Sequence, residues 1–375
     1  MEARSGGATL CARLYDPGAC PVSRPALSMS DSSNSPAEVA ATGNARGLAA
    51  APIHIFNGFL NPTGGSELEA LALYGLLRRE REVHLWATSS RVSRELMRRF
   101  PIRRISLPRR QVPRSGTFIF VGAHWRNKLW PYLIAKPTRL IYVYNTFHPK
   151  VVGLTSHMPR ALGWPQTEFV LISEFQKSLL GLQLAVQVHP SPIDIQAFAP
   201  LPHARGGRVV IGRMSRDAPD KHDPRDLPLY RELAAAGCTV RLQGASCIGN
   251  ALAGIPHVGV APEGRLPAPE FLHGLDIFYY RSGVHVETFG RVVFEAMACG
   301  LPVVCQAHGG YAEAIRHGEN GFLFETTDQA RAILLQLATD PALCRTIGQA
   351  ARATVEAMYA PAAIAERMRF YLGPP

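Results

Sequence analysis

The sequence of 375 residues has no run of about 18 uncharged apolar residues, so it predicts no helix that spans a bilayer. Its seven cysteines are scattered, odd in number and without the spacing of metal ligands. This usage fits a reducing cytoplasm better than a disulfide framework. No Ser-His-Asp order, histidine-rich cluster or Asp-x-Asp pair stands out. We therefore expect neither a membrane-spanning protein nor a metal site.

Acidic residues are scarce in one long stretch. Residues 78–150 contain 17 lysines and arginines but only three acids, within a chain of net charge +11. Such a stretch indicates an anionic partner, which is nucleic acid, an anionic lipid surface or a phosphorylated substrate. The alternative is an arginine-rich surface that only keeps the protein in solution.

Residues 1–50 are rich in serine, alanine, glycine and proline and show no apolar period, which predicts a disordered extension. They contain no continuous apolar region of a secretory signal. Met29 is an alternative start to Met1.

From residue 51 on, apolar segments alternate with amphipathic ones, and nearly half of the chain is apolar. This alternation predicts parallel sheets covered by helices on both faces. Strands are expected within 51–60, 82–88, 116–122, 140–147, 168–175, 207–216, 238–246, 276–282, 301–310 and 321–326. Helices are expected within 61–80, 226–237, 268–275, 291–300, 311–318 and 361–373, the first with a capping box formed by Ser66 and Glu69.

The strand pattern restarts after a proline-rich connector near residues 188–203. We therefore expect two Rossmann-like, doubly wound domains that face a cleft. The expected limits are 51–203 for the first domain and 204–357 for the second. Residues 358–375 are expected to form a helix that packs back on the first domain.

The segment HVETFGRVVFEAMACG (285–300) carries two acids, Glu287 and Glu295, eight positions apart. On one helix they would be separated by about 12 Å and share one face, which suits hydroxyl groups at the two ends of a nucleotide sugar. A helix amino terminus near Phe289 and Gly290 would offer amides to phosphate between them. The alternatives are a helix-start acid that only favours the dipole and a surface acid.

The block ETFGRVVFEAMACGLPVV resembles the E-x7-E signature of family 4 retaining glycosyltransferases, which have the GT-B fold. The likeness continues in HGGYAEAIRHGENGFLF (308–324), IGRMSRDAPDKHDP (211–224), VLISEFQKSLL (170–180), VHPSPIDIQAFAP (188–200) and PTGGSE (62–67). It covers roughly residues 53–370, and the long block is far more specific than a lone glycine loop.

The resemblance implies roles for individual residues. Glu287 would hold the donor sugar and Glu295 the ribose hydroxyls, while Arg213 and Lys221 would neutralise the diphosphate without a metal. The spacing between these two cations is longer than in many relatives, so Arg216 is a candidate to share or replace either role. The remaining donor contacts implied are Thr288, Phe289, Gly290, Gly64 and Gly65.

A histidine, His148 in YNTFHP, matches a position that contacts the sugar in that family. A structural histidine is the alternative. His124 is a weaker candidate, and the amides of His308, Gly309 and Gly310 are expected either to line the donor sugar or to shape a turn. The glycine pair at 64–65 is expected either to admit phosphate or acceptor, or to make a tight turn. Cys299 and Cys305 are expected to be core residues.

The segment 91–100 predicts a short helix with Arg91, Arg94, Arg98 and Arg99 mostly on one side, which suggests a peripheral contact with an anionic membrane. A solvated basic face is the alternative.

Taken with the resemblance, the sequence predicts a cytoplasmic enzyme that transfers a sugar from a nucleotide-sugar donor to a glycan or lipid-linked acceptor hydroxyl, with retained configuration. No metal cofactor and no nucleic-acid partner are expected. The alternatives are a nucleotide-sugar epimerase of the same fold and a catalytically inactive basic binding protein, whose binding would fall steeply with salt.

Overall fold

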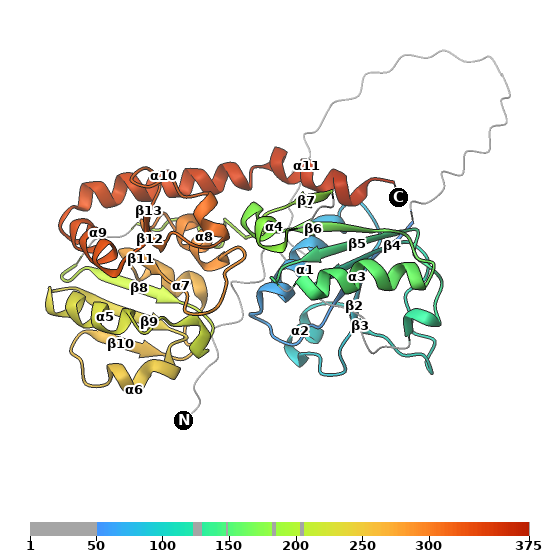
Figure 1. Cartoon of the computed structure of the whole chain (residues 1–375), viewed down its shortest axis with the longest axis horizontal. Helices are drawn as coiled ribbons and strands as arrows, with labels where there is room; N and C mark the ends of the chain where they lie inside the picture. The colour runs from blue at the N-terminus through green and yellow to red at the C-terminus, as the bar shows by residue number, and fades with distance from the viewer. Residues whose placement is uncertain (1–50, 123–129, 148, 182–184, 203–205, 375) are drawn as a thin grey trace, which may run out of the picture.

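The computed structural model describes residues 51–122, 130–147, 149–181, 185–202 and 206–374. These residues form two α/β domains, each built on one parallel sheet (Figure 1). The expectation of two Rossmann-like domains is therefore confirmed. The disordered extension expected over residues 1–50 lies outside the described residues.

The first sheet has seven strands in the order β3-β2-β1-β4-β5-β6-β7, and every pairing is parallel. Its strands are β1 (Ile53–Asn57), β2 (Val83–Ala87), β3 (Ile102–Arg104), β4 (Thr117–Val121), β5 (Arg139–Tyr144), β6 (Thr167–Leu171) and β7 (Val186–Val188).

The second sheet has six parallel strands in the order β10-β9-β8-β11-β12-β13. Its strands are β8 (Val210–Met214), β9 (Thr239–Gln243), β10 (Val258–Ala261), β11 (Ile277–Tyr280), β12 (Val303–Gln306) and β13 (Phe322–Phe324).

Three strands have no counterpart among the expected ones, and all three are edge strands. β3 and β7 close the two sides of the first sheet, and β10 closes one side of the second. Central strands such as β1, β4 and β5 are buried along their whole length, because helices cover both faces. The edge strands are short and partly exposed, so they show no continuous apolar run.

Helices connect most of the strands, and the last three, α9, α10 and α11, follow the final strand β13. The helices are α1 (Gly65–Leu77), α2 (Arg94–Arg99), α3 (Pro149–Ala161), α4 (Glu174–Leu180), α5 (Asp226–Ala235), α6 (Gly249–Leu252), α7 (Ala268–His273), α8 (Arg291–Ala298), α9 (Thr327–Thr339), α10 (Pro341–Met358) and α11 (Pro361–Leu372). Short 3-10 turns are η2 (Trp130–Tyr132), η3 (Pro219–Lys221), η4 (Ser246–Ile248) and η5 (Gly310–Glu313).

Two local expectations about helices are wrong. The segment 311–318 forms only the short turn η5, because the chain then makes a second turn, closed by the bridge between His317 and Gly321, before it enters β13. The capping box at Ser66 is absent, since α1 begins at Gly65 with Gly64 as its N-cap. Ser66 lies inside the helix, and its hydroxyl accepts a hydrogen bond of 2.7 Å from Asn57 at the end of β1.

The last two helices join the domains. α10 packs against α8 in the C-terminal domain, and α11 packs against α1 in the N-terminal domain (Figure 1). Tyr371 of α11 belongs to the apolar core around β1 and α1. Arg139 at the start of β5 donates a hydrogen bond of 2.7 Å to the carbonyl of Phe370. The C-terminal helix is thus a structural part of the first domain.

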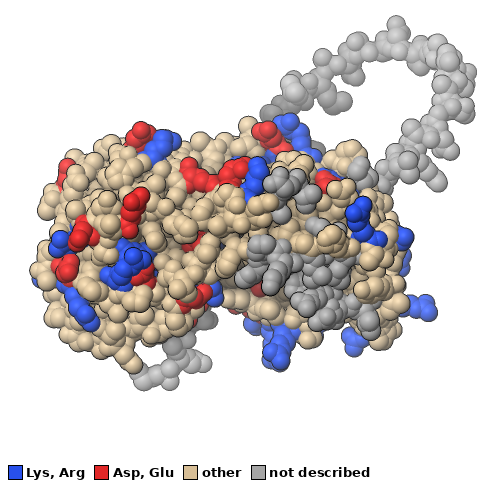
Figure 2. Space-filling model, in the orientation of Figure 1, with Lys and Arg blue, Asp and Glu red and all other residues tan. Residues whose placement is uncertain are grey.

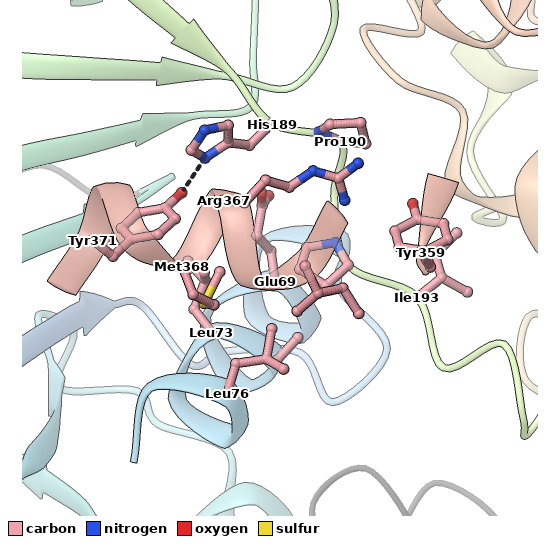
Figure 3. Close-up of a pocket in the computed structure, with 13 residues that line it drawn as sticks. Glu69, Leu73, Leu76, His189, Pro190, Ile193, Tyr359, Arg367, Met368 and Tyr371 are labelled. Carbon is pink, nitrogen blue, oxygen red and sulfur yellow. Dashed lines mark hydrogen bonds between the residues drawn. The ribbon is translucent and has the colours of Figure 1, made fainter. Parts of the chain in front are cut away.

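The chain passes between the domains twice, near residues 189–193 and between α10 and α11, and both passages line one cavity of about 50 Å³ with α1 (Figure 3). The Tyr359 hydroxyl donates a hydrogen bond of 2.6 Å to the carbonyl of Ser191. His189 and Tyr371 are hydrogen-bonded at 3.3 Å between Nδ1 and Oη. We call this region the hinge cavity.

Glu69 of α1 points into the hinge cavity and is only 3% exposed (Figure 3). Its Oε2 accepts a hydrogen bond of 3.2 Å from Asn145. Burial raises the pKa of Glu69 from its ordinary 4.5 to about 7, although Asn145, Arg291 and Ser191 all act in the opposite direction.

Candidate functional site

The loops that follow the strands of both sheets meet where the two domains touch. Ser173, which follows β6, donates a hydrogen bond to the carbonyl of Thr288, which follows β11. The Thr288 hydroxyl donates a hydrogen bond of 3.3 Å to the carbonyl of Asn145, which follows β5. The carboxylate of Glu313 accepts hydrogen bonds from the first amides of α4. In such folds ligands bind at the carboxyl ends of the strands, so this interface is the candidate site.

At its centre Lys221 of η3 forms an ion pair and a hydrogen bond with Glu287, in the segment that joins β11 to α8. The Tyr280 hydroxyl is also hydrogen-bonded to Glu287. Burial by itself raises the pKa of Glu287, but the charge and hydrogen bond of Lys221, together with His285 and Tyr280, outweigh it, so the pKa lies below its ordinary value. The acid expected to hold the sugar and a cation expected to bind diphosphate are therefore partners in this structure.

Arg213 at the end of β8 is 1% exposed and lies over the ring of Tyr280. Its Nη2 donates hydrogen bonds to the carbonyls of Lys221 and Arg281, and its Nη1 donates one to the hydroxyl of Ser215 at 2.9 Å. Its Nε has no hydrogen-bond partner among the described residues. Arg213 thus holds the backbone that carries Lys221 and supplies a buried positive charge beside it.

The helix start near Phe289 and Gly290 is where the sequence predicts it. Gly290 is the N-cap of α8 with φ of 84°, a conformation that favours glycine, and a Cβ there would lie 2.3 Å from the Tyr311 ring. Phe289 is buried and stacks on Phe294, so only its backbone is available to a ligand. Glu287 precedes the helix, as the expected helix start near Phe289 and Gly290 requires, so a helical rise of about 12 Å does not describe its separation from Glu295.

Glu295 lies inside α8 and forms an ion pair of 2.9 Å with Arg291, one turn earlier. Arg291 also donates a hydrogen bond of 2.7 Å to the carbonyl of Pro192 in the hinge. Burial raises the pKa of Glu295, which Arg291 offsets in part. Glu295, which is expected to bind the ribose, is therefore linked through Arg291 to the segment that connects the domains.

The two glycines before α1 have different surroundings. A Cβ on Gly64 would lie 2.3 Å from the carboxylate of Glu67, which accepts hydrogen bonds from the amides of Leu60 and Asn61. A Cβ on Gly65 would meet nothing within 4 Å. A side chain at position 64 would thus have to displace the Glu67 carboxylate, whereas Gly65 leaves open space at the helix start.

The other candidate residues are scattered around this centre. Arg216 is half exposed and pairs with Asp220 at 3.6 Å. A Cβ on Gly310 would lie 2.1 Å from the Thr288 carbonyl, so close packing of the turn requires this glycine. His308 is exposed, and its ring meets that of Phe175 across the interface. Cys299 and Cys305 are buried, as expected of core residues. His148 and His124 lie outside the described residues.

Sequence reasoning missed several residues of the interface, among them Asn145, Ser173, Glu313 and His285. The first three act through hydrogen bonds between segments far apart in the chain, which no local pattern signals. His285 lies two positions before Glu287, so its place in the sequence was a signal that could have been used.

In the described part of the chain, no group of three or more His, Cys, Asp or Glu side chains is arranged to hold a metal ion. The described helices also include none that is both long and apolar enough to cross a membrane.

The sequence is similar to those of known glycosyltransferases. Residues 260–354 match the family model described as glycosyl transferases group 1. A GDP-mannose-dependent alpha-(1-6)-phosphatidylinositol monomannoside mannosyltransferase of Mycolicibacterium smegmatis is 30% identical over 202 residues, 47% of this chain and 53% of that protein. A D-inositol 3-phosphate glycosyltransferase of Kribbella flavida is 31% identical over 207 residues, 46% of this chain and 48% of that protein. The chain spans about half the length of these two relatives.

Solved structures match over a larger share. Anabaena Alr3699/HepE in complex with UDP and glucose has a TM-score of 0.65 at 15% identity, covering 86% of this chain and 99% of that chain. WaaG, a glycosyltransferase involved in lipopolysaccharide biosynthesis, has a TM-score of 0.63 at 13% identity, covering 85% of this chain and 99% of that chain. The chain therefore has the GT-B fold. Its residues 260–354 match the model of the group 1 glycosyl transferases, so the expected likeness to glycosyltransferases is confirmed.

Proposed function

We propose that this chain transfers a sugar from a nucleotide-sugar donor to an acceptor hydroxyl, with retained configuration and without a metal ion. The observation that carries the proposal is the cluster at the domain interface. Lys221 and Glu287 are paired there, and Arg213 donates a hydrogen bond to the backbone carbonyl of Lys221. A nucleotide sugar presents a diphosphate to the cation and hydroxyls to the carboxylate, so it offers both members of the pair a partner.

In this proposal the donor opens the ion pair. Lys221 turns to the diphosphate and stabilises the negative charge that grows as the glycosidic bond breaks. Arg213 adds a buried positive charge and keeps Lys221 in place, so its role is positioning more than direct contact. Glu287 accepts hydrogen bonds from sugar hydroxyls, and Glu295 accepts them from the ribose. The acceptor hydroxyl attacks from the face that the nucleoside diphosphate leaves, which retains the configuration.

The test is a panel of UDP-, GDP- and ADP-sugars, scored for donor hydrolysis and for thermal protection, which mass action predicts for any ligand of the native state. We expect one nucleotide to protect wild type, and Lys221→Met to abolish that protection. Interconversion of sugars without an acceptor would indicate the epimerase. Salt-sensitive nucleic-acid binding without any donor response would indicate the inactive binding protein.

For partners, we propose a glycan or lipid-linked acceptor and a cytoplasmic protein that contacts an anionic membrane. Figure 2 shows lysine and arginine side chains around the rim of the N-terminal domain with few acids among them. Around α2 and β3 the exposed arginines are Arg91, Arg94, Arg98, Arg103, Arg104, Arg109, Arg110 and Arg114. Most of the apolar side of α2 is not available to lipid, because Val92, Leu96 and Phe100 are buried, although Met97 is exposed. The contact we propose is therefore electrostatic.

A further inference from the structure

His285 lies between the two carboxylates that flank the proposed phosphate cation. Its backbone amide donates a hydrogen bond of 3.0 Å to the carbonyl of Asp220. Its Nδ1 lies 3.3 Å from the Asp220 carboxylate, and its Nε2 lies 3.4 Å from Oε1 of Glu287. The side chain is 26% exposed, so it is accessible but not free to leave the interface.

His285 also touches the opposite domain. Its ring packs edge-on against that of Phe147, which follows β5 in the N-terminal domain, with 6.1 Å between the ring centroids. The imidazole is thus held on three sides, by Asp220, by Glu287 and by a residue of the other domain.

Two groups therefore compete for one oxygen. Lys221 and His285 both face Oε1 of Glu287, whose side chain is only 12% exposed. A buried carboxylate that loses its cation faces a large desolvation penalty unless another donor replaces it. In the proposed function the incoming diphosphate draws Lys221 away from Glu287, at the moment when this carboxylate must be held in place for the sugar.

We propose that His285 is a positioning residue, whose Nε2 takes over the Glu287 carboxylate when Lys221 turns to the diphosphate. This inference rests on the proposed function, because only a diphosphate ligand gives Lys221 a reason to leave. It assigns His285 no contact with the reacting atoms. It makes the histidine the group that keeps Glu287 aimed at the sugar throughout turnover.

The charges around the ring support the exchange. Lys221 and Asp220 of η3, Arg216 of the preceding loop and Glu287 of its own segment all face His285. Burial first, and then Lys221, lower the pKa of His285, while Glu287 and Asp220 raise it. When Lys221 moves away, one group that lowers the pKa of His285 is removed and both carboxylates remain. The imidazole is then protonated over a wider pH range, so it is a stronger hydrogen-bond donor to Glu287 while Lys221 binds the diphosphate.

Two substitutions separate the two ring nitrogens. His285→Gln places an amide nitrogen near the position of Nε2 and keeps the donor to Glu287, whereas His285→Asn places one near Nδ1 and keeps only the donor to Asp220. We expect kcat of His285→Gln within about threefold of wild type. We expect kcat of His285→Asn to fall at least about tenfold with little change in donor KM, because Glu287 is misaligned in the transition state. Equal losses in both variants, or the reverse order, would overturn the proposal.

A second measurement does not need turnover. NMR titration of the His285 ring, identified by the signal that His285→Gln loses, should show a higher pKa in Lys221→Met than in wild type. Inorganic pyrophosphate should raise the pKa in wild type and not in Lys221→Met. An unchanged pKa in Lys221→Met would show that the lysine does not govern this histidine, and the proposal would fail. Absence of any donor response in wild type would instead remove the proposed function.

Discussion

Glu295 and Arg291 are one helical turn apart on α8 and form an ion pair of 2.9 Å. Arg291 also donates a hydrogen bond to the carbonyl of Pro192 between the domains, so it links a proposed donor-binding acid to that segment. Binding at Glu295 is therefore connected to the position of the chain between the domains.

Glu295→Gln should leave the protein folded and raise the donor KM by about tenfold to a hundredfold, since a hydrogen bond to a charged group contributes about 1.5–3 kcal/mol. Steady-state kinetics over a range of donor concentrations measures this. The matched control is Glu356→Gln on α10, which removes a similar Arg–Glu pair with Arg352 at 2.7 Å on the surface. The same KM in both variants would show that Glu295 does not bind the donor.

Glu287→Gln should lower the free energy of unfolding by about 3 kcal/mol, because it leaves the buried ammonium of Lys221 unpaired. The double variant Lys221→Met/Glu287→Gln should recover most of that loss. Urea unfolding of wild type, both single variants and the double variant gives the coupling energy directly. A coupling energy near zero would mean that the pair adds nothing to the ligand-free state.

Glu69 should make stability depend on pH. Its native pKa of about 7 exceeds its ordinary 4.5, so between these values the native state holds the proton that the unfolded state releases. Stability from this group is therefore present below pH 4.5 and is lost as pH rises toward 7, by about 3 kcal/mol in total. Glu69→Gln should gain stability relative to wild type by that amount over the same window, as measured by urea unfolding at a series of pH values.

The control for that series is Glu80→Gln, which changes an exposed carboxylate just after the same helix. Its difference from wild type should stay constant with pH. A constant difference for Glu69→Gln as well would show that burial of the hinge carboxyl does not hold its proton.

Gly65→Ala tests whether an acceptor or a phosphate approaches the start of α1, because its effects on stability and on turnover should then differ in direction. Gly65 is the first residue of α1 with open space above it, so alanine should raise stability by about 0.5–1 kcal/mol. If substrate approaches this backbone closely, turnover falls while stability rises. Gly249→Ala is the control, since Gly249 begins α6 with only a distant contact at 3.8 Å. Unchanged kinetics in both variants would leave Gly65 as a turn residue only.

Reversal of charge at Arg94, Arg98, Arg109 and Arg110 to glutamate should reduce co-sedimentation with vesicles of anionic lipid, because each basic residue near such a surface contributes about 1 kcal/mol. Soluble donor hydrolysis should remain as in wild type. A quadruple reversal on the C-terminal domain, at the exposed Arg231, Arg265, Arg316 and Arg345, is the matched control. Equal sedimentation of both variants would remove the membrane proposal.

The fold was predictable because its central strands are buried on both faces and carry continuous apolar runs. The strands that escaped prediction, β3, β7 and β10, are edges, where one side of the strand has no neighbour and the sequence needs little apolar character. Arg103 and Arg104 in β3 look like part of a basic loop in the sequence, and only pairing with β2 makes them a strand.

The structure brings together three of the expected site residues, Arg213, Lys221 and Glu287, but their geometry was not predictable. The helical rise of about 12 Å between Glu287 and Glu295 applies only if both acids lie on one helix. The left-handed conformation at Gly290 starts α8 only after Glu287, and spacing alone carries no information about that conformation. The contact of His285 with Phe147 joins residues 138 positions apart, so it depends on how the two domains dock.

The return of α11 to the first domain has a consequence for biosynthesis. The backbone carbonyl that accepts a hydrogen bond from Arg139 lies 231 positions later in the chain, in α11. The surface of α1 that α11 covers is apolar. While the protein is being synthesised, the N-terminal domain leaves the ribosome with that surface uncovered and cannot complete its packing until α11 has also been synthesised. Domains usually fold in the order in which they leave the ribosome, but here the N-terminal domain cannot be completed before the C-terminal domain has emerged.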